Sequence, residues 1–151
     1  MSLEERLLDD MKLAMKAGDK IKLSTIRMLR SQTKDAKINK KSDLDENEVE
    51  QILVKAAKAR NEAIEMYSKG NRDDLVLKEK QELEIISAYL PEQLSNDEIV
   101  KIIHETITDL NVQDEKDMGR VMGSIMPKVK GKADGKLVQQ KVRETLSALP
   151  K

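Results

Sequence analysis

The chain contains no cysteine, tryptophan or phenylalanine, and Tyr67 and Tyr89 are its only aromatic residues. Without cysteine, neither a disulfide framework nor a thiolate-bound metal can form. With so few rings, the protein lacks a platform on which the bases of single-stranded nucleic acid could stack. No run approaches the roughly 20 apolar residues of a membrane-spanning helix, and the acidic start lacks the apolar segment of a secretory signal. We therefore expect a cytoplasmic protein with no membrane partner.

Proline and glycine are also scarce, with three and six residues among 151, and alternating β-branched runs are missing. The periodicity therefore predicts an all-α protein. Ser2-x-x-Glu5, Asp45-x-x-Glu48 and Ser95-x-x-Glu98 fit the capping box that opens a helix. Gly18 is placed to end the first helix, and Asp19 to cap the second.

Pro91 marks the clearest boundary, because the residue before a proline is pushed out of the α region. We expect a bundle-like half of four helices over residues 1–90. A proline hinge joins it to a three-helix domain over residues 91–151. In that second domain, Pro127 is expected to kink or end the helix that starts near Met118.

The net charge is zero, with 28 Lys and Arg against 28 Asp and Glu, but the charges form blocks. Residues 12–41 contain ten basic side chains against two acids, and residues 43–50 contain five acids and no base. Residues 119–143 contain seven basic side chains against Asp134 alone. The net charge of zero is therefore the sum of two basic blocks and one acidic block.

Four arginines, Arg27, Arg30, Arg60 and Arg72, could contact RNA. Arg and Glu at three-four spacing on a helix more often form solvated surface pairs. Arg60 with Glu62 to Glu65 fits that pattern. These arginines are therefore left out of the candidate site.

Known catalytic and metal motifs are incomplete. Gly131–Leu137 resembles a phosphate loop, but its glycine spacing is one residue short and Leu137 stands where a hydroxyl should bind magnesium. His104-Glu105 lacks the second histidine of a zinc protease. Asp43-x-Asp45-x-Asn47 begins like a calcium loop, but Glu48 occupies the glycine position. We expect no catalytic residue, no metal ligand and no cofactor.

The most informative stretch is residues 118–137. Gly119 and Gly123 lie four apart, and so on one helical face. Each costs about 1 kcal/mol relative to alanine but lets another backbone approach closely. Two interpretations stay open, tight packing of helices or close approach of a nucleic-acid backbone.

Lysines alternate with glycines in the loop that follows. With the amino end of the last helix, they form an arrangement suited to anions, although a merely solvated loop is the alternative interpretation. The candidate RNA-binding residues are Gly119, Arg120, Gly123, Lys128, Lys130, Gly131, Lys132, Gly135 and Lys136.

These residues resemble a known family. Over essentially all 151 residues the chain is similar to stand-alone members of the GatB/YqeY family, of the bacterial YqeY type. The resemblance rests on Leu23–Arg30, Lys58–Glu62, Gly70–Leu75, Tyr89–Leu94 and Met118–Lys136.

The second half is similar to the tail domain of the GatB component of the tRNA-dependent amidotransferase. That enzyme converts Glu-tRNA(Gln) or Asp-tRNA(Asn) to the amide form, with glutamine as nitrogen donor. The resemblance implies an all-α, two-part architecture, tRNA or another structured RNA as partner, and residues 119–136 as the contact. The chain is too short for the catalytic cradle or the amidase, and their motifs are not found.

The sequence thus favours an RNA-binding accessory module without its own catalytic centre, with amidotransferase subunits as further candidate partners. The alternative is a protein-interaction module that uses the acidic block 43–50 and the eight methionines as an adaptable surface.

Overall fold

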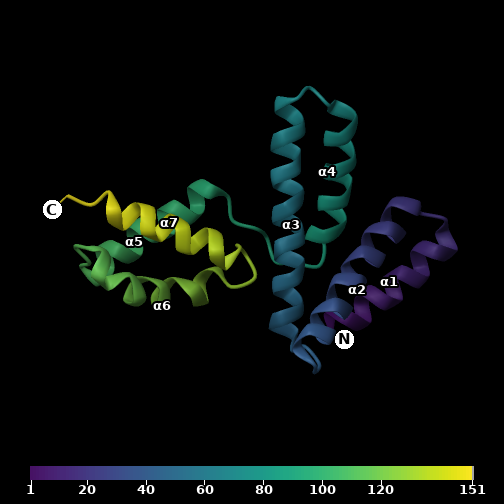
Figure 1. The fold of residues 1–151 in the computed structure, drawn as a ribbon, viewed down its shortest axis with the longest axis horizontal. Coiled ribbons are helices and arrows are strands. Elements are labelled where there is room, and N and C mark those ends of the chain that lie inside the picture. The colour runs from purple at the N-terminus through teal and green to yellow at the C-terminus, as the bar shows by residue number, and fades with distance from the viewer. Residues whose placement is uncertain (151) are drawn as a thin grey trace. The chain divides into compact units, whose positions relative to one another are not determined.

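A computed structural model describes residues 1–150, and the regular structure in this range is entirely helical. The predicted all-α class is therefore confirmed. Figure 1 shows α1 (Leu3–Ala17), α2 (Lys20–Lys40), α3 (Glu46–Lys69), α4 (Asp73–Ser87), α5 (Asn96–Leu110), the 3-10 helix η1 (Glu115–Asp117), α6 (Met118–Val129) and α7 (Gly135–Ser147).

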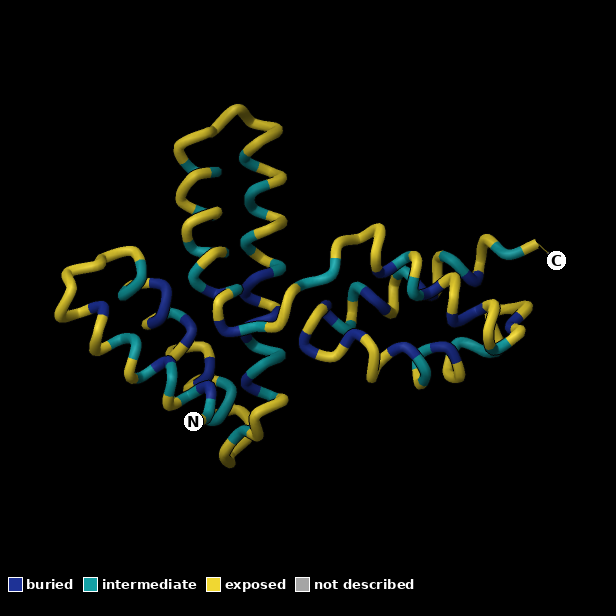
Figure 2. Tube along the Cα trace, turned by 180° about the vertical axis from the view of Figure 1, so that it is seen from behind, coloured by how far each residue is buried: buried dark blue, intermediate teal, exposed yellow. Residues whose placement is uncertain are grey.

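The chain divides into two compact units, an N-terminal unit of Met1–Pro91 and a C-terminal unit from Glu92 onward. Each unit has its own apolar core, seen as the dark segments in Figure 2. The assignment of residues 1–90 and 91–151 as two domains stays a prediction.

Two helical hairpins, α1–α2 and α3–α4, make up the N-terminal unit. Their apolar stripes meet in one core, which excludes water from almost entirely aliphatic side chains. The buried residues of this core are Leu3, Leu7, Ile26, Leu29, Val49, Leu53, Ala56, Ala57, Ile86 and Tyr89.

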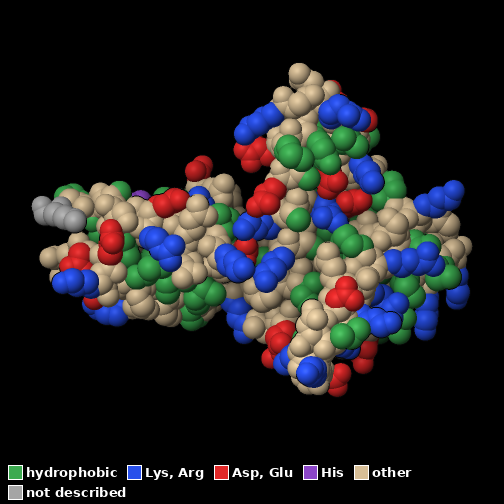
Figure 3. All heavy atoms as spheres, in the orientation of Figure 1, with side chains coloured by type: hydrophobic (Ala, Val, Ile, Leu, Met, Phe, Trp, Pro, Cys, Tyr) green, Lys and Arg blue, Asp and Glu red, His purple; other side chains and the backbone are tan. Residues whose placement is uncertain are grey.

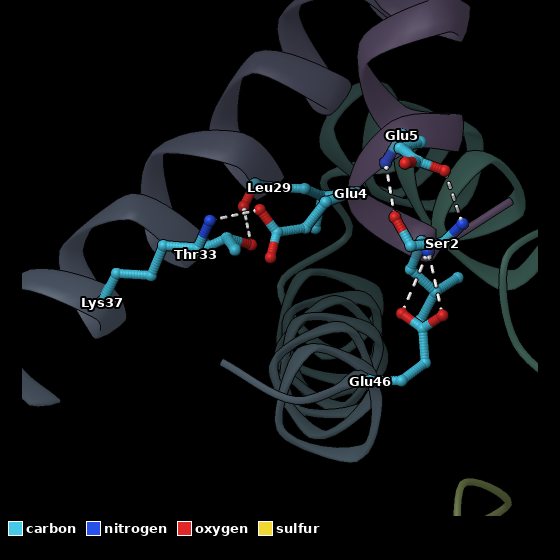
Figure 4. Close-up of polar contacts among 8 residues, drawn as sticks. Ser2, Glu4, Glu5, Leu29, Thr33, Lys37 and Glu46 are labelled. Atoms are coloured by element: carbon cyan, nitrogen blue, oxygen red, sulfur yellow. Dashed lines mark hydrogen bonds and ion pairs between the residues drawn. The ribbon is translucent and has the colours of Figure 1, made fainter. Parts of the chain in front are cut away.

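Local capping sets where α1 begins and how it meets α3. The Ser2 hydroxyl accepts from the Glu5 amide (3.1 Å), and the Ser2 amide donates to the Glu5 carboxylate (3.0 Å), which completes the predicted capping box. The next amide, Leu3, donates to both carboxylate oxygens of Glu46 on α3 (3.0 and 3.2 Å). Figure 4 shows this convergence, which satisfies free amides of α1 and ties its start to α3.

An ion pair joins α1 to α2 beside this cap. The Lys37 ammonium lies 2.5 Å from the Glu4 carboxylate (Figure 4), and both side chains are about one-third exposed. The hydrogen bond to Glu4 raises the pKa of Lys37 above its ordinary value.

The acidic block 43–50 is largely used in building the N-terminal unit. Asp45 caps α3 by accepting from the Glu48 amide (2.7 Å), and Glu46 caps α1. Glu48 pairs with Lys40 at 2.6 Å, a hydrogen bond that lowers the pKa of Glu48 and raises that of Lys40. Three of its five acids thus have internal partners.

The outer part of the α3–α4 hairpin has little core. Between Ala57 and Ile86 no residue is fully buried, and Figure 2 shows this end of the hairpin as exposed or half-buried. Arg60 on α3 joins the two helices, with its Nε 2.8 Å from Glu82 and 3.6 Å from Glu79 on α4. Among the described residues this Nε has no partner of hydrogen-bonding geometry, so the contact with Glu82 is mainly electrostatic.

Arg60 therefore corrects one sequence-based expectation. It was predicted to form a solvated pair with acids on its own helix. Instead its side chain is only 16% exposed and pairs with α4. Helical spacing identifies neighbours on one helix, whereas the partner from α4 is set by tertiary packing.

Tyr89, just after α4, connects that end of the hairpin to α1. Its hydroxyl donates to the Asp10 carboxylate (2.5 Å), and the Arg6 guanidinium lies 5.0 Å from the ring centroid. Burial, and then the hydrogen bond to Asp10, raise the pKa of Tyr89 well above its ordinary value. The phenol therefore serves as a neutral donor.

We predict that Tyr89→Phe lowers the free energy of unfolding by about 1–2 kcal/mol, because the half-buried Asp10 carboxylate loses a donor. Urea unfolding monitored by circular dichroism measures the change. Tyr67→Phe is the matched control, since no hydrogen bond of the Tyr67 hydroxyl is found within the described range, and it should change stability little. Equal effects of the two substitutions would contradict the assigned role of the bond.

Helices α5, α6 and α7 enclose the core of the C-terminal unit. The Ser95 hydroxyl caps α5 by accepting from the Glu98 amide (3.1 Å), and Asn111 ends it with a left-handed φ of 53°. The buried residues of this core are Ile99, Ile103, Ile107, Val112, Val121, Ile125, Val129, Ala133, Val138, Val142 and Leu146.

Pro127 does not end α6, which continues to Val129. The proline removes the amide that would bond to the carbonyl of Gly123. Val129 is nevertheless fully buried, as is Ile125 one turn earlier. Packing of these two side chains holds the last turn in helical form, so of the two outcomes expected at Pro127, a kink or an end, the end does not occur.

Candidate nucleic-acid interface

The loop between α6 and α7 has a backbone fixed by hydrogen bonds. The Val129 carbonyl accepts from the amides of Lys132 (2.8 Å) and Ala133 (3.1 Å). Gly131 has a φ of 74°, a left-handed conformation that glycine adopts without steric cost. The turn is therefore closed by local bonds and by a glycine suited to its geometry.

The segment before α5 holds the same loop from outside. The Gln93 side-chain amide donates to the Gly131 carbonyl (2.8 Å), and the Leu94 amide donates to the Lys132 carbonyl (2.9 Å). The sequence predicted only a proline hinge at this point and not this role, because no local pattern marks a pairing across 38 residues. The loop is thus tied to the helical unit at two successive carbonyls.

The lysine ammonium groups of this region are open to solvent. Lys130, Lys132 and Lys136 are exposed, and no ion pair is found for them within residues 1–150. Lys128 is also exposed and has only a long contact with the Thr106 hydroxyl (3.4 Å). Flexible cationic side chains therefore extend from a fixed backbone.

The amino end of α7 is occupied by a side chain of the protein. Asp134 is buried and caps the helix, its carboxylate accepting from the Lys136 amide (3.3 Å). The anion-binding arrangement predicted here combined lysines with helix amides. A carboxylate already takes one of those amides, so the lysines are the part left open.

The four candidate glycines differ in their surroundings. A Cβ added at Gly119 or Gly123 would meet no atom within 4 Å, and both residues are exposed. A Cβ at Gly135 would lie 3.5 Å from the Met126 methyl, which is an ordinary contact. Of the two interpretations of Gly119 and Gly123, tight packing inside the protein is therefore not observed, and they form an open strip on α6.

Arg120, the remaining candidate, is exposed but has partners within the unit. Its guanidinium donates to the Leu110 carbonyl at the end of α5 (3.3 Å) and lies 3.7 Å from Asp117. An RNA contact would compete with these weak interactions, so Arg120 is less available than the lysines.

Charge in the C-terminal unit is divided along the chain. Residues 92–117 contain eight acids against Lys101 and Lys116, whereas residues 118–143 contain seven basic side chains against Asp134. The acids thus gather on α5 and η1, and the bases on α6, its loop and α7. An anionic partner would be attracted to α6, its loop and α7 rather than to α5 and η1.

Over residues 1–150, no three histidine, aspartate or glutamate side chains come together as metal ligands, and no helix combines the length and apolar character needed to cross a bilayer.

The described residues thus form an all-helical protein with a lysine-rich loop between α6 and α7. Residues 4–146 match the model of the family described as Yqey-like protein, and the chain belongs to this family. The family resemblance seen in the sequence is thereby confirmed.

Named relatives come from fungi. The chain is 29% identical over 146 residues to Altered inheritance of mitochondria protein 41, mitochondrial, of Pyrenophora tritici-repentis, covering 95% of this chain and 80% of the relative. It is 30% identical over 125 residues to the protein of that name in Saccharomyces cerevisiae, covering 79% and 68%. For the Lachancea thermotolerans protein the identity is 41% over 85 residues, covering 56% of this chain and 46% of the relative. The chain thus spans about half the length of that third relative.

These names contradict the predicted cytoplasmic location, since each contains the word mitochondrial. The prediction failed because it inferred a location from the lack of two kinds of segment. The lack of an apolar secretory segment and of a membrane span does not establish a location, and mitochondrial transit peptides, for example, are amphipathic and Arg-rich. The comparisons with these fungal proteins also lend no support to the bacterial type, which stays a prediction.

We predict that Gly123→Ala raises the free energy of unfolding of the C-terminal unit by up to about 1 kcal/mol. Alanine favours the helix, and its methyl group would meet open space. Thermal unfolding by calorimetry provides the measurement. Ile125→Ala serves as the control of opposite sign, because it opens a cavity in the core. Destabilisation by Gly123→Ala would show that the glycine is needed for packing after all.

Proposed function

We propose that this Yqey-like protein is an RNA-binding accessory module that holds phosphate groups through its C-terminal unit and has no catalytic centre of its own. The observation that carries the proposal is the set of exposed lysines, Lys130, Lys132 and Lys136, on a loop whose backbone is hydrogen-bonded in place. A fixed loop loses less conformational entropy on binding than a free one.

Binding by these groups would be electrostatic and largely independent of sequence. Lysine contacts to phosphates release counterions and give affinity without identifying bases. With two tyrosines in the chain, recognition by stacking on splayed bases has little support. The partner would therefore be a structured RNA gripped by its backbone and shape.

The open strip at Gly119 and Gly123 supports the same proposal. It allows a sugar-phosphate backbone to approach α6 without meeting side chains. The strip lies on α6, the helix that leads into the basic loop. The choice of tRNA rests on the similarity of residues 91–151 to the tail of the amidotransferase GatB component. On that similarity, the module would act beside amidotransfer as an adaptor. The alternative of a protein-interaction module through residues 43–50 is weakened by the internal use of that block.

We predict that Lys130→Glu with Lys132→Glu weakens binding of unfractionated tRNA at least tenfold at about 50 mM salt. The slope of log affinity against log salt should become shallower by about 2, since two phosphate contacts are lost. Fluorescence anisotropy over a salt series measures both quantities.

Lys101→Glu with Lys116→Glu is the matched control, because it reverses the same charge on the acidic side of the unit. It should weaken binding far less. A tRNA affinity too weak to detect at this salt, or equal losses from both pairs, would refute the proposal. Gly119→Ala with Gly123→Ala adds a second arm, and it should weaken tRNA binding while leaving the helix content intact.

A further inference from the structure

The end of the α1–α2 hairpin, residues 12–22, presents aliphatic side chains to solvent. Leu13 is 61% exposed, Met15 52% and Ile21 42%. Single exposed aliphatic residues are ordinary on protein surfaces, but here three lie within nine positions at the end of one hairpin. These residues lie outside the C-terminal unit, on which the RNA contact is proposed.

The turn geometry places these side chains at one end of the hairpin. Gly18 ends α1 with a φ of 69°, and Asp19 caps α2 by accepting from the Lys22 amide (3.1 Å). At 1.5 Å per residue, Leu13 lies within about 6 Å of the end of α1 along its axis. Ala14, between Leu13 and Met15, is buried, so it faces the core while its neighbours point outward on either side.

Lysines are interleaved with the aliphatic residues. Lys12, Lys16 and Lys20 are exposed and Lys22 is half-buried, and no ion pair is found for them among the described residues. The only acid in the segment is Asp19, which is engaged as a helix cap. Figure 3 shows basic and hydrophobic side chains intermixed over the α1–α2 region. The hairpin end therefore combines a cationic surplus with accessible hydrocarbon.

In place of the sequence-based expectation of no membrane partner, we propose that residues 12–22, here called the hairpin tip, dock on the surface of an anionic lipid bilayer. Lysine ammonium groups attract the acidic headgroups, while the three aliphatic side chains enter the boundary between headgroups and acyl chains. Lysine stems reach back toward the headgroups from a partly inserted helix end.

The aliphatic residues favour a lipid surface over RNA. Phosphate contacts in nucleic acids are satisfied by cations alone, so RNA gives little reward for the burial of leucine, methionine and isoleucine. A bilayer rewards both properties, because hydrocarbon leaves water and cations meet acidic lipids. Charge complementarity thus selects an anionic partner, and the hydrocarbon selects a membrane.

The test is co-sedimentation of the full chain with unilamellar vesicles. One set contains phosphatidylcholine alone, and the other contains about one-third phosphatidylserine, whose charge attracts basic residues. We expect at least tenfold stronger partitioning to the anionic vesicles. Leu13→Ser with Met15→Ser and Ile21→Ser should weaken that partitioning about tenfold or more, and so should Lys12→Glu with Lys16→Glu.

Matched controls come from the same unit. Ile38→Ser with Met66→Ser and Leu77→Ser replaces three aliphatic residues of similar exposure, 60–62%, outside the tip. Lys78→Glu with Lys80→Glu reverses two exposed lysines on α4. Both controls should retain vesicle binding, and circular dichroism should show that every variant keeps its helix content.

Three outcomes would overturn the proposal. The first is equal binding to neutral and anionic vesicles, or to neither. The second is full binding by the triple serine variant, which would reduce the effect to non-specific charge attraction. The third is a loss of tRNA affinity in the tip variants equal to that of Lys130→Glu with Lys132→Glu, which would make the tip an RNA surface. Lys130→Glu with Lys132→Glu itself should retain vesicle binding.

Discussion

Each helix of this protein has one narrow apolar stripe, and the burial of these stripes against one another is the constraint from which the fold follows. Aliphatic residues must supply nearly all of the core, because the chain has two aromatic rings and no cysteine. The stripes close into two separate cores, with ten and eleven buried residues. A helix covered along one stripe keeps its other faces at the surface. Those faces contain the lysines, arginines and glycines on which the proposed functions depend.

Features set by neighbouring residues could be predicted from the sequence, and features set by tertiary contacts could not. Ser2-x-x-Glu5 and Asp45-x-x-Glu48 form the capping boxes that their spacing indicated, and Gly18 ends α1 in the left-handed conformation. Of the two outcomes expected at Pro127, a kink or an end, the end does not occur, because the burial of Val129 two residues later outweighs a local helix breaker. Arg60 was misjudged because its acidic partners lie on another helix. Local rules fail where packing contributes more free energy than propensity does.

In the candidate site, too, features set by neighbouring residues were predictable and features set by tertiary contacts were not. Alternating lysine and glycine in residues 128–136 was visible in the sequence, whereas the left-handed turn at Gly131 was not predicted. The anchors of the loop, Gln93 and Leu94, were invisible because they act across 38 residues. The occupied amino end of α7 was also missed, although an aspartate directly before a helix is itself a capping signal. The sequence thus identified the exposed lysines. Only the structure showed that Asp134 already occupies one of the helix amides beside them.

The acids of the basic blocks explain where the positive charge stays available. Asp19 and Asp134 cap the starts of α2 and α7, and each is a single acid among several lysines. Farther along α2, Lys37 and Lys40 do meet carboxylates, from Glu4 and Glu48. The lysines of the hairpin tip and of the α6–α7 loop have no such carboxylate partner among the described residues. Their neighbours differ, with exposed aliphatic side chains at the tip and glycines without side chains beside the loop. Hydrocarbon beside cations suits a lipid interface, whereas a bare helix face beside cations suits a close phosphate backbone. The same charge, in two different surroundings, thus argues for two different anionic partners.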